Sequence, residues 1–276
     1  MLLPLKDDNP SARTPYVTYG LIAINLAVML WMSQYSAIEE HVALVEHGFI
    51  PARIAQLGDP NLVVNVPLDA EPPGRERQRF LPVGRPVQVE VVRLEPVRGQ
   101  IMATIITTMF LHAGWLHVLG NMWFLWIFGN NVEDRLGPFL FLPFYLVGGL
   151  LATACHWAYD PHSTIPVVGA SGAVATVLGA YAVTFPKASV RTLVFLGVIT
   201  IINVPALLWL GLWFGGQLFN AFFLDKDLTV AVWAHIGGFV AGAFLMPILS
   251  FGSPPPGSSW EEELKKHFSF TPPDRN

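Results

Sequence analysis

Long apolar runs separated by short polar segments dominate the pattern of this chain. A helix that crosses a bilayer needs about 20 mostly apolar residues, and six runs approach that length. These runs predict an all-α, polytopic membrane protein with a six-helix membrane domain over residues 17–250. The six predicted spans are residues 17–32, 111–130, 139–159, 167–185, 204–223 and 230–250.

The segment between the first two predicted spans, residues 33–100, forms a long first loop whose character changes along its length. Its first part, 47–54, has a pattern typical of a partly helical, interfacial segment. Its middle, 69–85, is a polar, proline-rich insert. Residues 87–94 partly alternate apolar and polar side chains, which predicts a short strand or hairpin.

Composition supports the membrane prediction, since 53% of the residues are hydrophobic and only 13% are charged. Soluble domains carry about 25% charged residues. The net charge is −4 without a basic block, so we expect the lipid bilayer and not nucleic acid as a partner. The single cysteine, Cys155, cannot form an intrachain disulfide and is interpreted as a packing residue. No small-residue cleavage site follows the first apolar run, so we expect a retained span and not a cleaved signal peptide.

The distribution of Lys and Arg predicts the orientation in the membrane. If the N-terminal segment 1–16 is cytoplasmic, the predicted inner segments hold eight of the sixteen basic residues, and the two short outer loops hold only Lys226. The first loop holds the rest, but loops longer than about 60 residues escape this bias. We therefore expect both termini, including a flexible tail at 251–276, to be cytoplasmic.

Two polar residues inside predicted spans carry the candidate chemistry. Ser171 lies about four residues into the fourth span and His235 about five into the sixth, both entered from the outer side. At 1.5 Å per residue, their depths are roughly 6 and 7.5 Å. The second span also starts outside and contributes His112, His117 and Asn121 at this level. A serine that meets a histidine there suggests acyl-transfer chemistry.

Small residues favour close contact between the helices that carry this pair. Gly238 and Gly242 form a Gly-xxx-Gly pattern in the sixth span, and Gly169 and Gly172 flank the serine in the fourth. Small residues at such spacing let membrane helices approach closely. Close approach is needed for a hydroxyl to reach an imidazole nitrogen at about 3 Å.

Each polar residue also has a structural interpretation, and two other functions use the same residues. A lone serine in a membrane helix usually bonds its own helix backbone. The three histidines suggest a zinc site or a proton path. However, no His-Glu-x-x-His pattern occurs, and the spans concerned lack acidic residues. We find no inverted repeat of the kind typical of transporters. We therefore expect no metal and no cofactor.

Three motifs together resemble the bacterial rhomboid family of intramembrane serine proteases, which have six spans. They are FLHAGWLHVLGNM at 110–122, GASG at 169–172 and AHIGG at 234–238, and the resemblance covers about residues 15–250. The stretch 49–53 is similar to the family's first loop. This resemblance implies a serine endopeptidase of a bacterial inner (plasma) membrane that cleaves single-span membrane proteins near the outer surface. The alternative is a catalytically silent, rhomboid-like protein that binds membrane helices, and either form allows a homo-oligomer.

The resemblance also implies roles for individual residues. Ser171 would be the nucleophile and His235 the general base. The oxyanion hole would consist of His117, Asn121 and the backbone N–H groups of Ser171 and Ala170. Gly169 would leave room for the substrate, and the fifth span with the loop after it would resemble the family's gate and cap. The remaining structural residues near the site would be His112, Gly172, Gly238 and Gly242.

The chain departs from the family pattern at two places. The family often has a Trp-Arg pair just before the second span, whereas residues 99–104 read GQIMAT, so the first loop needs another anchor. Ala175 occupies the position where an aromatic ring often packs on the catalytic histidine. In addition, the acid nearest to the second span, Glu133, lies twelve residues from Asn121, roughly 18 Å along a helix. A dyad without a carboxylate is therefore expected.

Overall fold

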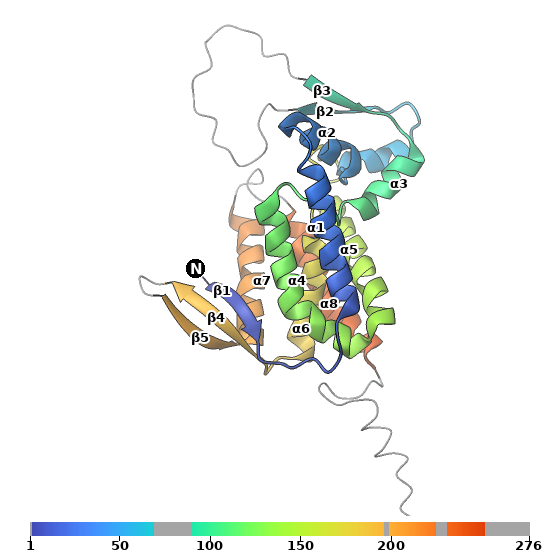
Figure 1. The fold of residues 1–276 in the computed structure, drawn as a ribbon. Helices are drawn as coiled ribbons and strands as arrows, with labels where there is room; N and C mark the ends of the chain where they lie inside the picture. Colours follow the sequence, from blue (N-terminus) through green and yellow to red (C-terminus); the bar gives the residue numbers. More distant parts are fainter. Residues whose placement is uncertain (1, 69–89, 196–198, 225–230, 252–276) are drawn as a thin grey trace, which may run out of the picture.

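The computed structural model describes residues 2–68, 90–195, 199–224 and 231–251. Six apolar helices form a bundle (Figure 1). Each helix coincides with one of the predicted runs, with ends that differ by a few residues. These helices are α1 (Tyr16–Met32), α4 (Trp115–Leu136), α5 (Pro138–Tyr159), α6 (Ser171–Thr184), α7 (Ala206–Phe223) and α8 (Val232–Leu249).

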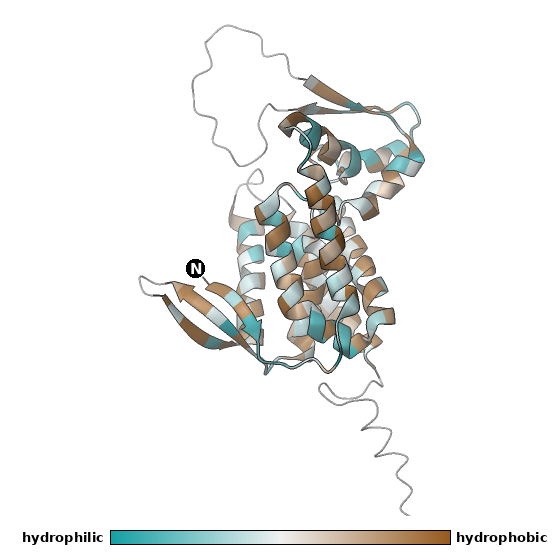
Figure 2. Cartoon of the chain, viewed as in Figure 1, coloured by the Kyte–Doolittle hydropathy of each residue, from teal (hydrophilic) through white to brown (hydrophobic). Residues whose placement is uncertain are grey.

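Length and hydropathy make the chain a membrane protein. Three of the described helices, α5, α7 and α8, are long and apolar enough to cross a bilayer, and α1 and α6 are shorter apolar helices. Figure 2 shows hydrophobic residues over the outward faces of the bundle, where side chains such as Leu151, Leu208 and Phe244 are exposed. Six complete crossings remain a prediction.

Helix α6 lies in the centre of the bundle, with every residue from Gly172 to Ala182 buried. It packs against α8 through small residues. A Cβ on Gly238 would overlap the carbonyl oxygen of Gly172, and one on Gly242 would overlap that of Thr176. The two backbones therefore touch directly, as the spacing of these glycines predicts.

The expectation of an all-α protein is wrong in one respect, because the structure contains two antiparallel sheets. Strands β1 (Leu2–Asp7), β4 (Ser189–Phe195) and β5 (Ile199–Pro205) form a three-stranded sheet in the order β1-β4-β5. Figure 1 places this sheet beside the bundle near α7. It pairs the N-terminal segment with the connection between α6 and α7, between residues 183 to 192 positions apart, which no local pattern indicates.

The second sheet belongs to the first loop and confirms the short strand predicted within residues 87–94. Strand β2 (Val64–Leu68) pairs with β3 (Glu90–Leu94), and the loop also contains α2 (Ala37–His47), the 3-10 helix η1 (Pro51–Leu57) and α3 (Arg98–Thr107). These elements lie together at one end of the bundle (Figure 1). The predicted proline-rich insert, residues 69–85, lies outside the described residues, and so does the tail after residue 251.

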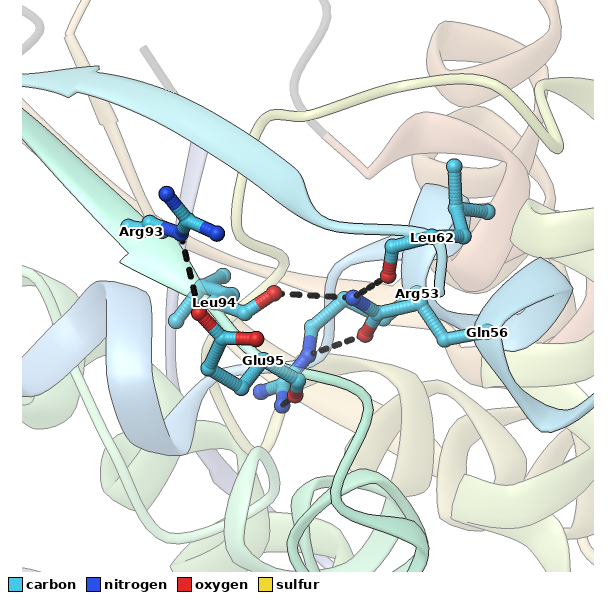
Figure 3. Close-up of polar contacts among 6 residues, drawn as sticks. All are labelled: Arg53, Gln56, Leu62, Arg93, Leu94 and Glu95. Carbon is cyan, nitrogen blue, oxygen red and sulfur yellow. Dashed lines mark hydrogen bonds and ion pairs between the residues drawn. The ribbon is translucent and has the colours of Figure 1, made fainter. Parts of the chain in front are cut away.

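A buried polar cluster joins separate segments of the first loop to one another (Figure 3). Arg53 is only 1% exposed, and its guanidinium donates to Oε1 of Gln56 at 3.2 Å and to the carbonyl oxygen of Glu95 at 3.3 Å. The amide of Gln56 donates to the carbonyl oxygens of Leu62 and Leu94, at 2.9 and 2.8 Å. This cluster ties η1 to the segment that precedes β2 and to the end of β3.

The opposite end of the bundle is joined by carboxylates. Glu133, at the end of α4, is 2% exposed and accepts hydrogen bonds from the backbone N–H groups of Val17 and Thr18 and from the Thr18 hydroxyl. It thus caps the N-terminus of α1, where the helix dipole favours a negative charge. Asp7 of β1 accepts from Nδ2 of Asn131 at 2.6 Å and from the Tyr181 hydroxyl at 2.7 Å.

Candidate active site

Ser171 is the first residue of α6, and the loop before it is held in an extended path. Val167 forms an antiparallel bridge with Phe49 of the first loop, and the N–H of Gly169 donates to the carbonyl oxygen of Thr108 at 2.9 Å. Gly169 has φ +123°, which L-residues rarely adopt. Because this loop resists continuation as a helix, α6 begins four residues later than predicted, with Ser171 at its N-terminus.

His235 lies in the first turn of α8 and faces Ser171. The helix starts after Ala231, whose φ of +61° is left-handed, and the N–H of His235 donates back to the carbonyl oxygen of Ala231. Nε2 of His235 lies 2.8 Å from Oγ of Ser171, and both residues are half-buried. The structure therefore joins the two residues that the sequence singles out by depth.

The other imidazole nitrogen has a partner that sequence reasoning missed. Oε1 of Gln217, on α7, lies 2.9 Å from Nδ1 of His235. One turn earlier on the same helix, the ring of Trp213 lies 6.1 Å from the imidazole, centroid to centroid. Trp213 and Gln217 are i and i+4, so they share the face of α7 that meets α8. The only signal in the sequence was an uncharged polar residue inside an apolar run.

The predicted residues of α4 and the loop before it gather on the other side of Ser171. A Cβ on Gly169 would lie 2.8 Å from the ring of His117 and 3.5 Å from Nδ2 of Asn121, so the glycine leaves a gap beside both side chains. Nδ2 of Asn121 is buried without a hydrogen-bond partner among the described residues. A buried donor without an acceptor lowers the stability of the fold, so this N–H₂ group is available to a further acceptor.

His112 and Ala170 are paired with each other. The N–H of Ala170 donates to Nε2 of His112 at 3.3 Å, and the imidazoles of His112 and His117 meet edge to face at 5.1 Å. His112 thus supports the loop before Ser171, which fits a structural role. The Ala170 N–H already has an acceptor here, which disagrees with its expected place in an oxyanion hole.

Packing residues around this site also lie where the sequence suggests. A Cβ on Gly172 would meet Cβ of Ala152 on α5 at 2.7 Å, and one on Gly237 would overlap Cys155. Cys155, on α5, therefore packs against α8. Within the described part of the chain, no group of three His, Cys, Asp or Glu side chains is arranged to hold a metal ion.

Comparison with known proteins identifies the family. The family model for the rhomboid domain matches residues 99–251, more than half of the chain and the part that contains Ser171, His235, His117 and Asn121. The chain belongs to the rhomboid family. The resemblance noted in the sequence is thereby confirmed at the level of the family.

Several curated rhomboid-like proteins are similar to this rhomboid chain. Rhomboid-like protein 11, chloroplastic, from Arabidopsis thaliana is 30% identical over 167 residues, which cover 58% of this chain and 56% of the relative. Presenilin-associated rhomboid-like protein A, mitochondrial, from Danio rerio is 31% identical over 170 residues, covering 60% and 41%. RHOMBOID-like protein 5 from Arabidopsis thaliana is 29% identical over 172 residues, covering 59% and 52%.

The chain spans about half the length of these curated relatives. They come from a plant and an animal, and two of their names place them in chloroplasts or mitochondria. Rhomboid membership and a membrane location are therefore established for this chain, whereas a bacterial inner membrane and cytoplasmic termini remain predictions.

Proposed function

We propose that this rhomboid is an intramembrane serine endopeptidase that hydrolyses peptide bonds in membrane-spanning segments. The observation that carries the proposal is the 2.8 Å contact between Oγ of Ser171 and Nε2 of His235. A hydroxyl and an imidazole from two separate apolar helices meet at hydrogen-bond distance, which is the arrangement required to activate a serine nucleophile.

The reaction follows from this contact. Nε2 of His235 accepts the hydroxyl proton while Oγ of Ser171 bonds to the scissile carbonyl carbon. The tetrahedral intermediate collapses when His235 returns the proton to the leaving nitrogen, which departs as an amine and leaves an acyl ester on Ser171. Water then attacks the ester with His235 as base, and the carboxylic acid product leaves as Ser171 recovers its proton.

The negative charge on the intermediate's oxygen needs hydrogen-bond donors, and three lie beside Ser171. The backbone N–H of Ser171 belongs to the first turn of α6, where N–H groups lack intrahelical partners and the helix dipole favours an anion. The free amide N–H₂ of Asn121 and the imidazole of His117 border the gap at Gly169. We assign the oxyanion hole to these three groups and leave out the N–H of Ala170.

The site constrains the substrate. A membrane helix satisfies its backbone hydrogen bonds internally, so its scissile carbonyl becomes accessible only where the helix unwinds. Ser171 and His235 lie at the N-terminal ends of α6 and α8, next to the first loop, and both are half-buried. We therefore expect single-span membrane proteins to be cleaved near the outer surface, within segments rich in glycine or other helix-weakening residues.

The distribution of Lys and Arg supports cytoplasmic termini, with the site near the opposite face. A bacterial inner membrane stays a prediction. A homo-oligomer remains an open prediction. The silent-binder alternative has less support, because a protein that only binds helices has no need of the Ser171–His235 hydrogen bond.

A labelling and cleavage assay tests the proposal. The full chain would be purified in detergent and treated with a fluorophosphonate probe, and separately with a single-span helical substrate. Ser171→Ala and His235→Ala would be compared with Ser33→Ala and His47→Ala, which change the same residue types at exposed positions outside the Ser171–His235 pair. We expect the first pair to abolish labelling and cleavage and the second pair to retain both. Cleavage that survives Ser171→Ala contradicts the proposal.

A further inference from the structure

Gln217 is the residue of α7 that touches the Ser171–His235 pair. Its Oε1 lies 2.9 Å from Nδ1 of His235, while Nε2 of the same ring lies 2.8 Å from Oγ of Ser171. Side chains of α6 and α7 therefore engage both nitrogens of the imidazole. We propose that Gln217 is a positioning residue, which holds His235 in the tautomer and orientation that accept the serine proton. This inference rests on the proposed protease function.

The tautomer argument follows from the two contacts. A neutral imidazole has one N–H donor and one acceptor nitrogen. If Nδ1 carries the proton, it donates to Oε1 of Gln217, and the lone pair of Nε2 is free to accept the Ser171 hydroxyl. The opposite tautomer would place a proton between Nε2 and Ser171 and leave Oε1 of Gln217 facing a lone pair. The amide oxygen at 2.9 Å therefore favours the tautomer that is competent as a base.

Trp213 also supports the imidazole of His235. It supplies the aromatic contact that Ala175 cannot make. The Trp213 ring lies 6.1 Å from the imidazole at a tilt of 43°, and it also contacts the ring of Phe239 on α8. Trp213 and Gln217 therefore provide one apolar and one polar contact from the same face of α7. Ala175, which is fully buried in α6, has no ring to supply.

An amide suits this position better than the carboxylate of a serine triad. Gln217 is half-buried in a largely apolar helix, on the face that meets α8, so a charge there would lie in apolar surroundings. A charged group within a membrane helix is costly. A neutral amide supplies the same acceptor without that cost. It also offers no negative charge to stabilise the imidazolium, so its contribution is smaller than that of a triad carboxylate.

The position of α7 thereby controls the base. The fully buried residues of this helix, Ala206, Trp209 and Leu210, lie in its first turn and a half. The half that carries Gln217 is held against α8 by half-buried side chains, including the rings of Trp213 and Phe214, which contact Phe239. A displacement of this half by about 1 Å stretches the hydrogen bond to Nδ1 beyond its range. His235 is therefore correctly oriented only while this half of α7 packs against α8.

Variants of Gln217 test the inference in the purified full chain. Gln217→Leu removes the acceptor at similar size, and Gln217→Glu keeps an oxygen acceptor and adds charge. Leu208→Ala is the control, because Leu208 lies on the opposite side of α7 and is 55% exposed. The readouts are the fluorophosphonate labelling rate, kcat and KM on a single-span substrate, and the pH profile of labelling. The titratable groups that interact electrostatically with His235 are His117 and His156.

We expect Gln217→Leu to lower labelling and kcat about tenfold with KM unchanged, the size of one neutral hydrogen bond. Gln217→Glu should label within about threefold of wild type. The acidic limb of its labelling-pH profile should move to higher pH, because a carboxylate favours the imidazolium form of His235. Wild-type labelling by Gln217→Leu overturns the inference. Equal losses in both variants without a shifted profile also overturn it, since a purely structural role predicts that result.

Nitrogen NMR of the histidines separates this inference from the protease function. In protein with ¹⁵N-labelled histidine, the His235 signals are those lost in His235→Ala. We expect the Nδ1–H tautomer in wild type and a loss of that preference in Gln217→Leu. An Nε2–H tautomer in wild type overturns the role of Gln217 even if the protein cleaves substrates. A wild type that neither labels nor cleaves defeats the proposed function, while the NMR result still decides the tautomer.

Discussion

Gly169→Ala probes the gap beside Ser171. Gly169 has φ +123°, and a Cβ there would lie 2.8 Å from Cε1 and Nε2 of His117. The same atom would lie 3.5 Å from Nδ2 of Asn121. Donors in an oxyanion hole must lie about 2.7–3.1 Å from the charged oxygen. The added methyl therefore occupies the space in which both side chains would meet that oxygen.

Two effects of this substitution must be separated. Backbone strain at such a φ costs about 1–3 kcal/mol of unfolding free energy. Loss of one oxyanion donor costs about 10²- to 10³-fold in kcat. Gly114→Ala is the matched control, because Gly114 has φ +126° and a Cβ there would meet nothing within 4 Å. Gly114→Ala therefore introduces the backbone strain but no steric contact.

The assay measures thermal unfolding in detergent and the rate of fluorophosphonate labelling for both variants. We expect similar losses of stability, a labelling rate near wild type for Gly114→Ala, and a rate at least about 100-fold lower for Gly169→Ala. Equal labelling of the two variants would refute the steric reasoning. A far larger stability loss in Gly169→Ala would show that the methyl acts on helix packing.

Three further predictions concern other parts of the fold. Burial raises the pKa of Asp7 from 3.8 to about 6, so folding favours its protonated form. Stability is then lost as pH rises from about 4 through 6, by at most about 3 kcal/mol, and Asp7→Asn should flatten a thermal-unfolding series over that range. Glu133→Ala removes the cap of α1 and should lower the unfolding free energy by about 1–2 kcal/mol, measured by denaturant titration; an unchanged midpoint would rule out the cap. Asn121→Ala should lower kcat about 10²-fold with little change in KM, and a change confined to KM in substrate-cleavage kinetics would argue against its role.

Much of the fold and the site could be predicted because the signals are local. An apolar run of spanning length predicts a helix wherever it occurs, and the bundle helices match those runs. The rise of 1.5 Å per residue places Ser171 and His235 at one depth, and the structure shows their side chains 2.8 Å apart. The close contact of α6 and α8 also follows from the spacing of Gly238 and Gly242.

Pairings between distant segments were decided by tertiary structure. Strand β1 pairs with β4, and Arg53 and Gln56 form hydrogen bonds to residues 42 and 38 positions further along the chain. Gln217 acquires its significance only because α7 turns that residue toward His235. Ala170, expected to donate to the oxyanion, instead donates to His112.

The difference between what the sequence predicts and what the tertiary structure decides has a physical reason. Solvent preference and backbone geometry act on each residue and its near neighbours, so the sequence by itself determines the apolar helices, their depth and the residue types able to react. A hydrogen bond between side chains depends on the rotation and separation of two whole helices to within a few tenths of an ångström. The packed bundle alone sets those quantities, and it therefore decided which donors and acceptors surround Ser171 and His235.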